Sequence, residues 1–243
     1  MTKGIIKYMK EAGNALLSLL YPHTCPFCGV VTKEPMCSKC ADRIRPVAEP
    51  KCKKCGKPIS SEKQEYCYDC TRTSHFYDRG FGLWLHQGQV KKSIYKYKYY
   101  NHRIYSQFYA GQLADIYGPV IHQWNIDLII PIPLYKKRRR QRGYNQAELV
   151  ARELGKILSI PVDAKNLQRL RNTAPQKQLE MKKRKSNLMH AFALKREFIP
   201  VSNVLLIDDI YTTGNTINSA ARVLKHEGVQ KVYFLTISIG QGN

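Results

Sequence analysis

The feature that most constrains the fold is the set of eight cysteines, all of which lie in Cys-x-x-Cys pairs before residue 71. The pairs are Cys25/Cys28, Cys37/Cys40, Cys52/Cys55 and Cys67/Cys70. With two residues between the cysteines, a tight turn points both sulfurs at one ion, and two such turns complete a tetrahedral structural site. Gly29 and Gly56 follow directly, where such a turn often needs a positive φ. The spacing predicts structural zinc.

The simplest arrangement is two zinc sites, formed by Cys25/Cys28/Cys37/Cys40 and by Cys52/Cys55/Cys67/Cys70. Crossed pairing, a second site without metal, a redox dithiol and an iron–sulfur cluster stay open as alternatives. A secreted disulfide framework fits poorly, because Met1–Tyr21 carries lysines and Glu11 within a broken apolar pattern and has no small-residue cleavage site. We therefore expect reduced thiols and a cytoplasmic protein.

The chain is expected to contain three parts. Residues 1–24 predict a short amphipathic helix that packs on the protein, with peripheral contact to the inner face of the membrane as the alternative. The apolar runs are far shorter than the ~20 residues of a membrane span. Residues 25–75 predict the zinc ribbon. Metal is expected to supply the folding energy of residues 25–70, so that chelation unfolds these residues and leaves the sheet domain largely folded. Residues 76–243 predict the main domain.

The main domain shows short apolar strands that alternate with amphipathic helices. The expected strands are Gly80–Leu85, Asp127–Pro131, Val204–Ile207 and Lys231–Ser238, and the expected helices are roughly Val90–Tyr117, Asn145–Leu158 and Thr216–Glu227. This alternation predicts an α/β fold with a parallel sheet, in which ligands bind at the carboxyl ends of the strands.

The sharpest chemical motif is the stretch Val204–Thr216. A buried apolar strand is followed at its end by Asp208 and Asp209, and then by the turn Thr212-Thr213-Gly214-Asn215-Thr216, which opens a helix. Backbone N–H groups and a helix N-terminus form an anion site, and neighbouring carboxylates accept hydrogen bonds from sugar hydroxyls or face Mg²⁺. The motif predicts a site for a phosphorylated ribose.

The chain is strongly basic, with a formal net charge of +22, which is typical of proteins that meet nucleic acid or phosphate-rich ligands. The cations cluster in two runs, Lys136-Lys137-Arg138-Arg139-Arg140-Gln141-Arg142 and Lys182-Lys183-Arg184-Lys185, for which we favour contact with DNA over a role with pyrophosphate alone. Lysines also alternate with Tyr95, Tyr97, Tyr99 and Tyr100. These rings either stack on bases or are buried, and burial is slightly favoured.

The Val204–Thr216 stretch resembles the phosphoribosyl pyrophosphate (PRPP) signature of type I phosphoribosyltransferases. Together with the cysteine pairs, the whole chain resembles the ComF family, late competence proteins of the ComFC type. Further family-like stretches are Leu20–Pro22, Lys96–Tyr99, Pro131–Leu134, Arg139 with Arg142–Gln146, Arg169/Arg171/Thr173/Gln176, Arg184/Asn187 and Ala191-Phe192. The resemblance implies a type I phosphoribosyltransferase-like sheet domain behind a small cysteine-rich zinc ribbon.

The resemblance also implies roles for residues. Asp208 and Asp209, the candidate catalytic pair, would hold the ribose hydroxyls of PRPP, Thr212–Thr216 its 5′-phosphate, Lys136–Arg142 the pyrophosphate with Mg²⁺, and Arg171–Lys185 would match a mobile loop over the site. We identify no element that would select a nucleobase. The expected function is therefore in natural competence and DNA uptake, binding a PRPP-like ligand and single-stranded DNA at the cytoplasmic side beside competence proteins. An active phosphoribosyltransferase with a nucleobase-like acceptor is the alternative.

Overall fold

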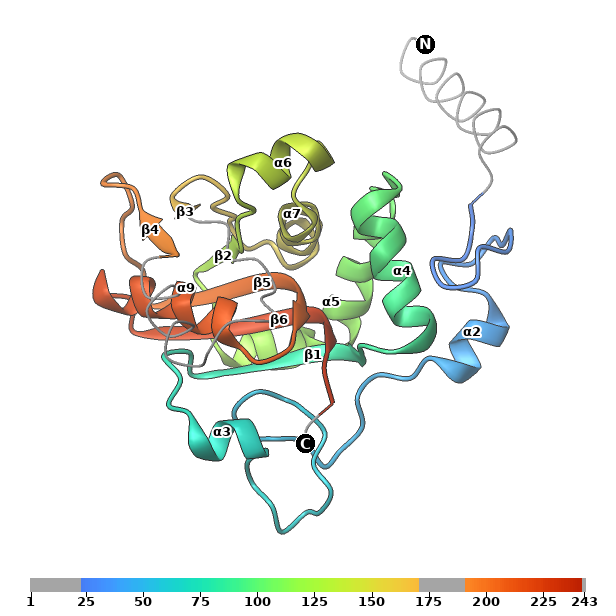
Figure 1. Ribbon diagram of the computed structural model, residues 1–243, viewed down its shortest axis with the longest axis horizontal. Helices are drawn as coiled ribbons and strands as arrows, with labels where there is room; N and C mark the ends of the chain where they lie inside the picture. Colours follow the sequence, from blue (N-terminus) through green and yellow to red (C-terminus); the bar gives the residue numbers. More distant parts are fainter. Residues whose placement is uncertain (1–22, 171–190, 242–243) are drawn as a thin grey trace, which may run out of the picture. The chain divides into compact units, whose positions relative to one another are not determined.

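A computed structural model describes residues 23–170 and 191–241 of the chain (Figure 1). Most of the helix expected over residues 1–24 lies outside these residues, and so does the cationic run Lys182–Lys185. The chain divides into two compact units, Met1–Arg45 and Pro46–Asn243. No helix in the described part of the chain is long and apolar enough to cross a membrane.

The first unit is built around the turn Cys25–Cys28. The N–H of Cys25 donates to the carbonyl of Val30 at 2.8 Å, and Gly29 takes a φ of 82° after the second cysteine. Helix α2 (Ser38–Arg43) then begins directly after Cys37 and carries Cys40 in its first turn. The predicted positive φ is confirmed at Gly29 and also at Gly56, where φ is 73°.

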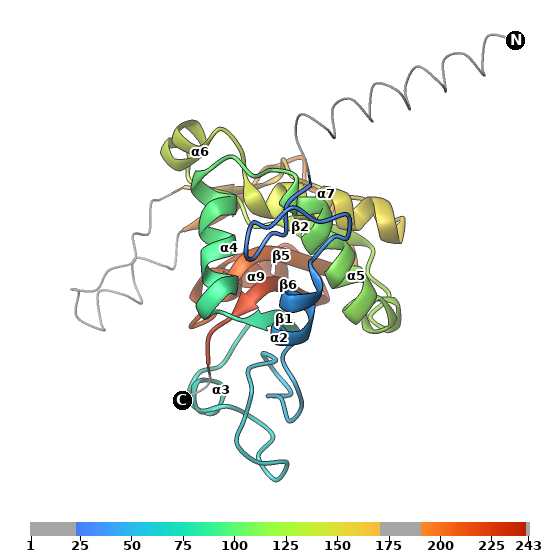
Figure 2. The ribbon, with the colours of Figure 1, turned by 90° about the vertical axis from the view of Figure 1, so that its right-hand side faces the viewer.

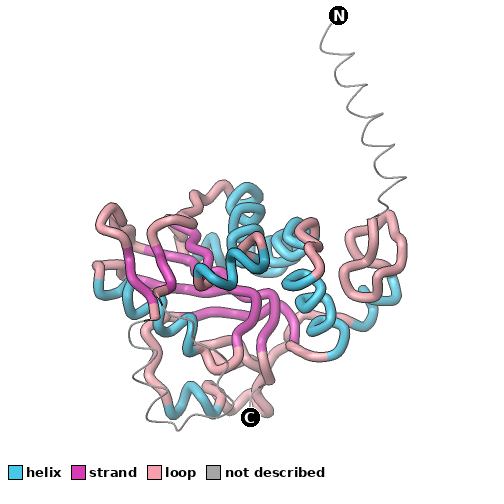
Figure 3. The backbone as a smooth tube through the Cα atoms, turned by 45° about the horizontal axis from the view of Figure 1, so that its top comes forward, coloured by secondary structure: helices cyan, strands magenta, loops and turns pink. Residues whose placement is uncertain are grey.

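The second unit contains a parallel sheet with the strand order β1-β6-β5-β2 (Figure 3). Its strands are β1 (Arg79–Leu85), β2 (Leu128–Pro131), β5 (Asn203–Tyr211) and β6 (Lys231–Ile239). The expected strands are therefore present. Val204–Ile207 are all fully buried, as in a parallel sheet that is covered on both faces.

The helices of the second unit cover both faces of this sheet. Helices α5 (Tyr105–Gln123) and α7 (Gln146–Leu158) pack on one face, and α9 (Asn215–His226) packs on the other. Helix α4 (Gly88–Tyr99) precedes α5, so the expected helical stretch Val90–Tyr117 is interrupted. The interruption follows Tyr100, where Asn101 takes a positive φ of 57°, which a continuous α-helix does not allow.

The second unit also contains a short helix and a small two-stranded sheet that were not expected from the sequence. Lys136–Arg142, the first cationic run, forms a short helix, α6. Strands β3 (Leu167–Arg169) and β4 (Phe192–Leu194) pair antiparallel in a separate small sheet, on either side of the residues outside the described part.

The second group of cysteines packs as part of the sheet unit. Cys52, Cys55 and Cys67 are at most 1% exposed and belong to the same apolar core as Phe234 and the inner face of α9. The N–H of Gly80 in β1 donates to the carbonyl of Lys54 at 3.1 Å, and α3 (Tyr68–Arg72) follows Cys67. This ribbon therefore also packs against the apolar core, and its dependence on metal stays a prediction.

Candidate functional site

The eight cysteines form two separate groups of thiols with the pairing that is simplest in sequence. Within each of the groups Cys25/Cys28/Cys37/Cys40 and Cys52/Cys55/Cys67/Cys70, the sulfur atoms all lie within 4.8 Å of one another. The Sγ atoms of Cys28 and Cys37 are 3.5 Å apart, and those of Cys55 and Cys67 are 3.6 Å apart. A zinc ion with Zn–S bonds of ~2.3 Å needs sulfur–sulfur separations of about 3.8 Å, so both groups fit structural zinc.

The two aspartates lie in the carboxyl-terminal part of β5. The sequence placed them after the end of the strand, and this is wrong because β5 continues to Tyr211 and pairs Asp208 with Thr236 of β6. Both side chains remain partly exposed. The Oδ1 atom of Asp208 accepts the N–H of Asp209 at 2.8 Å, which fixes the first carboxylate against the backbone.

Cations from two distant segments face this acid pair. The Nζ atom of Lys98, on α4, lies 2.8 Å from a carboxylate oxygen of Asp209. Burial and then the charge of Asp209 raise the pKa of Asp208 to about 7, while Lys98 and Arg169 act in the opposite direction. Burial lowers the pKa of Arg169 on β3, and the positive charge of Arg138 on α6 adds to this effect. The acids therefore lie among compensating positive charges.

The turn after β5 has the backbone geometry that the sequence predicted for an anion site. Gly214 is the N-cap of α9 and has a φ of 76°. A Cβ atom at this position would lie 2.4 Å from the hydroxyl of Tyr211, so only glycine fits beneath the turn. Thr212, Thr213 and Asn215 are exposed. The first turn of a helix leaves its N–H groups without helical partners, and these groups can bind an anion.

The ring of Tyr211 supports this turn from below. It is buried, stacks on Phe234 with ring centroids 4.8 Å apart, and its hydroxyl lies 2.6 Å from that of Tyr77. The neighbouring rings therefore hold the start of the anion turn in place.

The cationic helix α6 is fixed by the residues that follow it. The side chain of Asn145 donates to the carbonyl of Ile132 at 3.0 Å, and the hydroxyl of Tyr144 donates to the carbonyl of Tyr97. The hydroxyl of Tyr97 in turn donates to the carbonyl of Gln146 at 2.9 Å. The stretch Arg142–Gln146 is thus a structural junction between β2, α4 and α7.

The cations of α6 divide by their surroundings. Lys136, Lys137 and Arg140 are exposed, whereas Arg138 is partly buried. Arg139 lies 3.2 Å from a carboxylate oxygen of Glu148.

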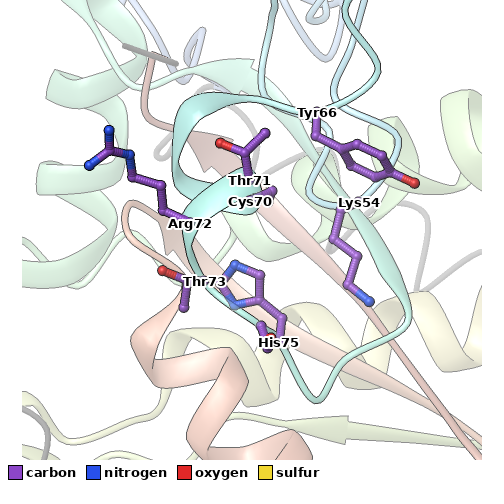
Figure 4. A pocket seen from close by; sticks show the side chains of 8 residues that line it. Lys54, Tyr66, Cys70, Thr71, Arg72, Thr73 and His75 are labelled. Carbon is purple, nitrogen blue, oxygen red and sulfur yellow. The ribbon is translucent and has the colours of Figure 1, made fainter.

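A pocket lies on the ribbon of the second unit and is drawn in Figure 4. It has a volume of about 460 Å³, and Lys54 and Arg72 lie on opposite sides of His75 in it. Both ring nitrogens of His75 are buried without a hydrogen-bond partner among the described residues, and burial lowers the pKa of this ring. None of the predicted sugar-phosphate residues lines this pocket.

Sequence reasoning missed three residues at the acid pair. They are Lys98, Arg169 and His86, whose Nδ1 atom lies 2.9 Å from the hydroxyl of Ser238 at the end of β6. His86 directly follows β1, so the strand pattern could have predicted its position at the carboxyl ends of the strands. Lys98 and Arg169 stand in stretches that resemble the family, but no local pattern assigned them to the acid pair, because they come from α4 and β3.

Two family models match the chain, and the first match runs across the boundary between the two compact units. The family model described as "Double zinc ribbon domain" matches residues 16–71, and the model described as "Phosphoribosyl transferase domain" matches residues 121–238. The second match covers β2, β5, α9 and most of β6, and so includes the acid pair and the anion turn.

Several curated proteins are similar in sequence. "Competence protein F" of Haemophilus influenzae is 32% identical over 216 residues, which cover 83% of this chain and 89% of that protein. "Competence protein ComFC" of Bacillus subtilis is 29% identical, with 67% of each chain covered. "DNA utilization protein YhgH" of Escherichia coli is 35% identical over 108 residues, 44% of this chain and 46% of that protein.

Two solved phosphoribosyltransferase structures match part of the chain at low TM-scores. Adenine phosphoribosyltransferase from Saccharomyces cerevisiae has a TM-score of 0.33 at 15% identity and covers 52% of this chain and 68% of its own. Purine phosphoribosyltransferase from Pyrococcus horikoshii has a TM-score of 0.34 at 14% identity, with 54% and 87% covered.

Proposed function

The chain belongs to the family of competence protein F and ComFC, and from this premise we propose that it acts in natural competence and DNA uptake by binding a PRPP-like sugar phosphate and single-stranded DNA. We place this activity at the cytoplasmic side, beside other competence proteins. One observation carries the proposal: the acid pair of β5 runs directly into the Gly214 turn of α9, with Lys98 and Arg169 beside the acids.

The proposed ligand follows from the chemistry of these groups. Carboxylates accept hydrogen bonds from the ribose hydroxyls, and the N–H groups of Thr212–Thr216 receive the 5′-phosphate at the positive end of α9. Arg169 and Arg138 offset the charge of the pyrophosphate. The ligand binds as its Mg²⁺ complex, because carboxylate and phosphate oxygens are the ligands that Mg²⁺ prefers. The ribose hydroxyls share Asp209 with Lys98.

Calorimetric titration of the zinc-loaded protein with PRPP and Mg²⁺ tests the sugar-phosphate site. We expect binding by the wild type and at least a tenfold loss of affinity in the Asp208→Asn/Asp209→Asn variant, since a hydrogen bond to a charged acceptor contributes about 1.5–3 kcal/mol. Asp115→Asn, at an exposed position on α5, is the matched control and is expected to bind as the wild type does. Equal affinities in all three proteins would refute the assignment of the acid pair.

The DNA part of the proposal rests on the charge of α6 and is tested by its salt dependence. For single strands, the slope of log K against log salt is about −0.7 for each phosphate contact, so Lys136→Gln/Lys137→Gln/Arg140→Gln is expected to flatten it by roughly two. The variant Lys165→Gln/Lys195→Gln/Arg196→Gln removes the same charge at the exposed end of the β3–β4 hairpin. This control variant is expected to bind single-stranded DNA with a salt dependence closer to that of the wild type. An affinity for single-stranded DNA that changes neither with salt concentration nor with these substitutions would exclude DNA binding from the proposed function.

A second candidate function is transfer of ribose 5-phosphate from PRPP to a nucleobase-like acceptor. It is favoured by the position of Asp208 beside Asp209 in the carboxyl-terminal part of β5, where burial and the neighbouring charge raise its pKa to about 7. A carboxyl group that titrates near neutrality suits proton transfer to or from a reacting base. Pyrophosphate release from PRPP and Mg²⁺ on addition of a base would support this enzyme. PRPP binding without release across a broad panel of bases would leave a binding domain.

A further inference from the structure

Helix α4 carries a group of exposed aromatic rings that the core does not use. Tyr95, Tyr99 and Tyr100 are 55%, 60% and 63% exposed, and we call them the tyrosine cluster. The centroid of the Tyr95 ring lies 4.8 Å from that of Tyr99 and 6.0 Å from that of Tyr100. The expected burial of the four tyrosines is therefore wrong for three of them, and only Tyr97 is buried.

The cluster is exposed because α4 buries its opposite face. Val90, Ile94 and Tyr97 recur at helical spacing on the buried side, together with Ser93, whose hydroxyl lies 2.6 Å from that of Tyr109. Tyr95 and Tyr99, four residues apart, therefore share the solvent side. Three neighbouring exposed rings form an apolar patch of a kind that soluble surfaces seldom carry without a binding partner.

Positive charge surrounds this patch. The guanidinium carbon of Arg142, at the end of α6, lies 5.0 Å from the centroid of Tyr99. Lys91 and Lys92 are exposed on α4. The sequence has no acidic residue from Arg79 to Ala114 or from Leu128 to Ala147, the segments that contain α4 and α6. In Figure 2, α6 lies above α4, and the contact between Arg142 and Tyr99 joins the carboxyl-terminal ends of the two helices. The tyrosine cluster is thus continuous with the cations of α6.

We propose that the tyrosine cluster and Arg142 form a base-stacking site for single-stranded DNA, whose phosphates follow the cations of α6. The proposal rests on the proposed function and adds the residues that contact bases. Aromatic rings stack on any base, and nearby cations track the backbone, which is the combination that binds single strands without sequence preference. Arg142 adds a planar cation on the same aromatic face.

A pair of oligonucleotide probes separates stacking from electrostatic attraction. Fluorescein-labelled oligo(dT) carries bases and phosphates, whereas an abasic strand of the same length carries phosphates alone. We expect the full-length zinc-loaded protein to bind oligo(dT) at least about fivefold more tightly than the abasic strand, as one stacked base is enough for this difference. Equal affinity for the two probes would overturn the stacking proposal.

Substitutions then assign the effect to the cluster. Tyr95→Leu/Tyr99→Leu is expected to lose at least about fivefold on oligo(dT) and to keep its affinity for the abasic strand. Tyr95→Phe/Tyr99→Phe keeps the rings and is expected to bind as the wild type does, which separates stacking from a folding defect. Tyr68→Leu is the matched control, because Tyr68 is 49% exposed and has the guanidinium carbon of Arg72 4.6 Å from its ring centroid.

The outcomes distinguish this proposal from the function on which it rests. Failure of the wild type to bind oligo(dT) at low salt would remove both. Salt-dependent binding of oligo(dT) that is unchanged in the leucine variant, or reduced equally on the abasic strand or by Tyr68→Leu, would overturn the stacking site alone. Loss of binding to anionic lipid vesicles in the leucine variant, with DNA binding unchanged, would identify the cluster as a membrane contact instead.

Discussion

At the scale of single residues, the acid pair is the most constrained feature of the site. Asp208 is held by the N–H of Asp209 and lies close to a second negative charge, which Lys98 compensates. Burial and Asp209 together raise the pKa of Asp208 from 3.8 to about 7. The protein without ligand thus keeps a carboxyl group in a place that disfavours its charge, and such strain is common at binding sites.

Asp208→Asn is expected to stabilise the protein without ligand, and the gain should grow with pH. Between pH 4 and 7 the folded state binds more protons at Asp208 than the unfolded state does, so wild-type stability falls as pH rises through this window. Asparagine keeps an acceptor for the N–H of Asp209 and carries no charge. The gain above pH 7 is on the order of 1–2 kcal/mol, because partial exposure screens the charge.

Thermal unfolding of Asp208→Asn and of wild type at pH 5 and pH 8 measures this effect. Asp115→Asn, on the exposed side of α5, serves as the control and should show no change of this kind between the two pH values. A difference in melting temperature that is the same at both pH values would mean that Asp208 does not titrate as described.

At the scale of elements, the junction of β5 and α9 determines whether the site can form. Gly214 combines a φ of 76° with close contact to the Tyr211 ring, so the turn is fixed by backbone conformation and by packing together. The hydroxyl of the same ring contacts that of Tyr77, two residues before the start of β1. The anion turn is therefore anchored in the core of the sheet unit.

Gly214→Ala is expected to destabilise the protein by about 1–3 kcal/mol and to abolish PRPP binding, because the new Cβ both strains the backbone and displaces Tyr211. Gly111→Ala is the matched control. On α5 a Cβ meets no atom within 4 Å, and alanine in a helix adds about 0.5–1 kcal/mol of stability. Denaturant unfolding and calorimetry on both variants make the comparison; retained PRPP binding in Gly214→Ala would contradict the role of the turn.

At the scale of the whole molecule, the two cysteine groups belong to different compact units. The first lies in Met1–Arg45, whereas the second lies in Pro46–Asn243 and contributes to the core that Phe234 and α9 share. Metal binding to the second group should therefore stabilise the sheet, since binding free energy to a folded site is folding free energy. This replaces the expectation that chelation leaves the sheet unit intact.

Substitution of each group separately tests this difference. Cys28→Ser/Cys37→Ser is expected to lose one zinc per chain and to leave unfolding of the sheet unit unchanged. Cys55→Ser/Cys67→Ser is expected to lower its stability by about 3 kcal/mol or more, or roughly 6–12 °C in melting temperature. Near-ultraviolet circular dichroism of the buried Trp84 and Trp124, both in the second unit, follows the transition. An equal loss of stability of the sheet unit in both variants would contradict the different roles of the two cysteine groups.

The tyrosines of α4 show where sequence patterns reach their limit. Tyr95, Tyr97, Tyr99 and Tyr100 are chemically alike, and alternation with lysine suits a strand, a helix or an exposed surface. Once the segment is known to be a helix, the spacing of Val90, Ile94 and Tyr97 selects Tyr97 for the core and leaves Tyr95 and Tyr99 outside. The sequence therefore contained the burial pattern of α4, but this pattern identifies Tyr97 as buried only when the segment is analysed with the helical period of 3.6 residues.

The sequence by itself determined the four Cys-x-x-Cys turns, the strands of the parallel sheet and the acid pair with its glycine turn. These features depend on residues close together in the chain, where spacing alone fixes which atoms converge. Tertiary structure decided that Lys98 reaches Asp209, that Arg169 faces Asp208, and that the second ribbon joins the core of the sheet. Such contacts join residues far apart in sequence, and packing of helices and loops against the sheet, which no local spacing encodes, brings them together.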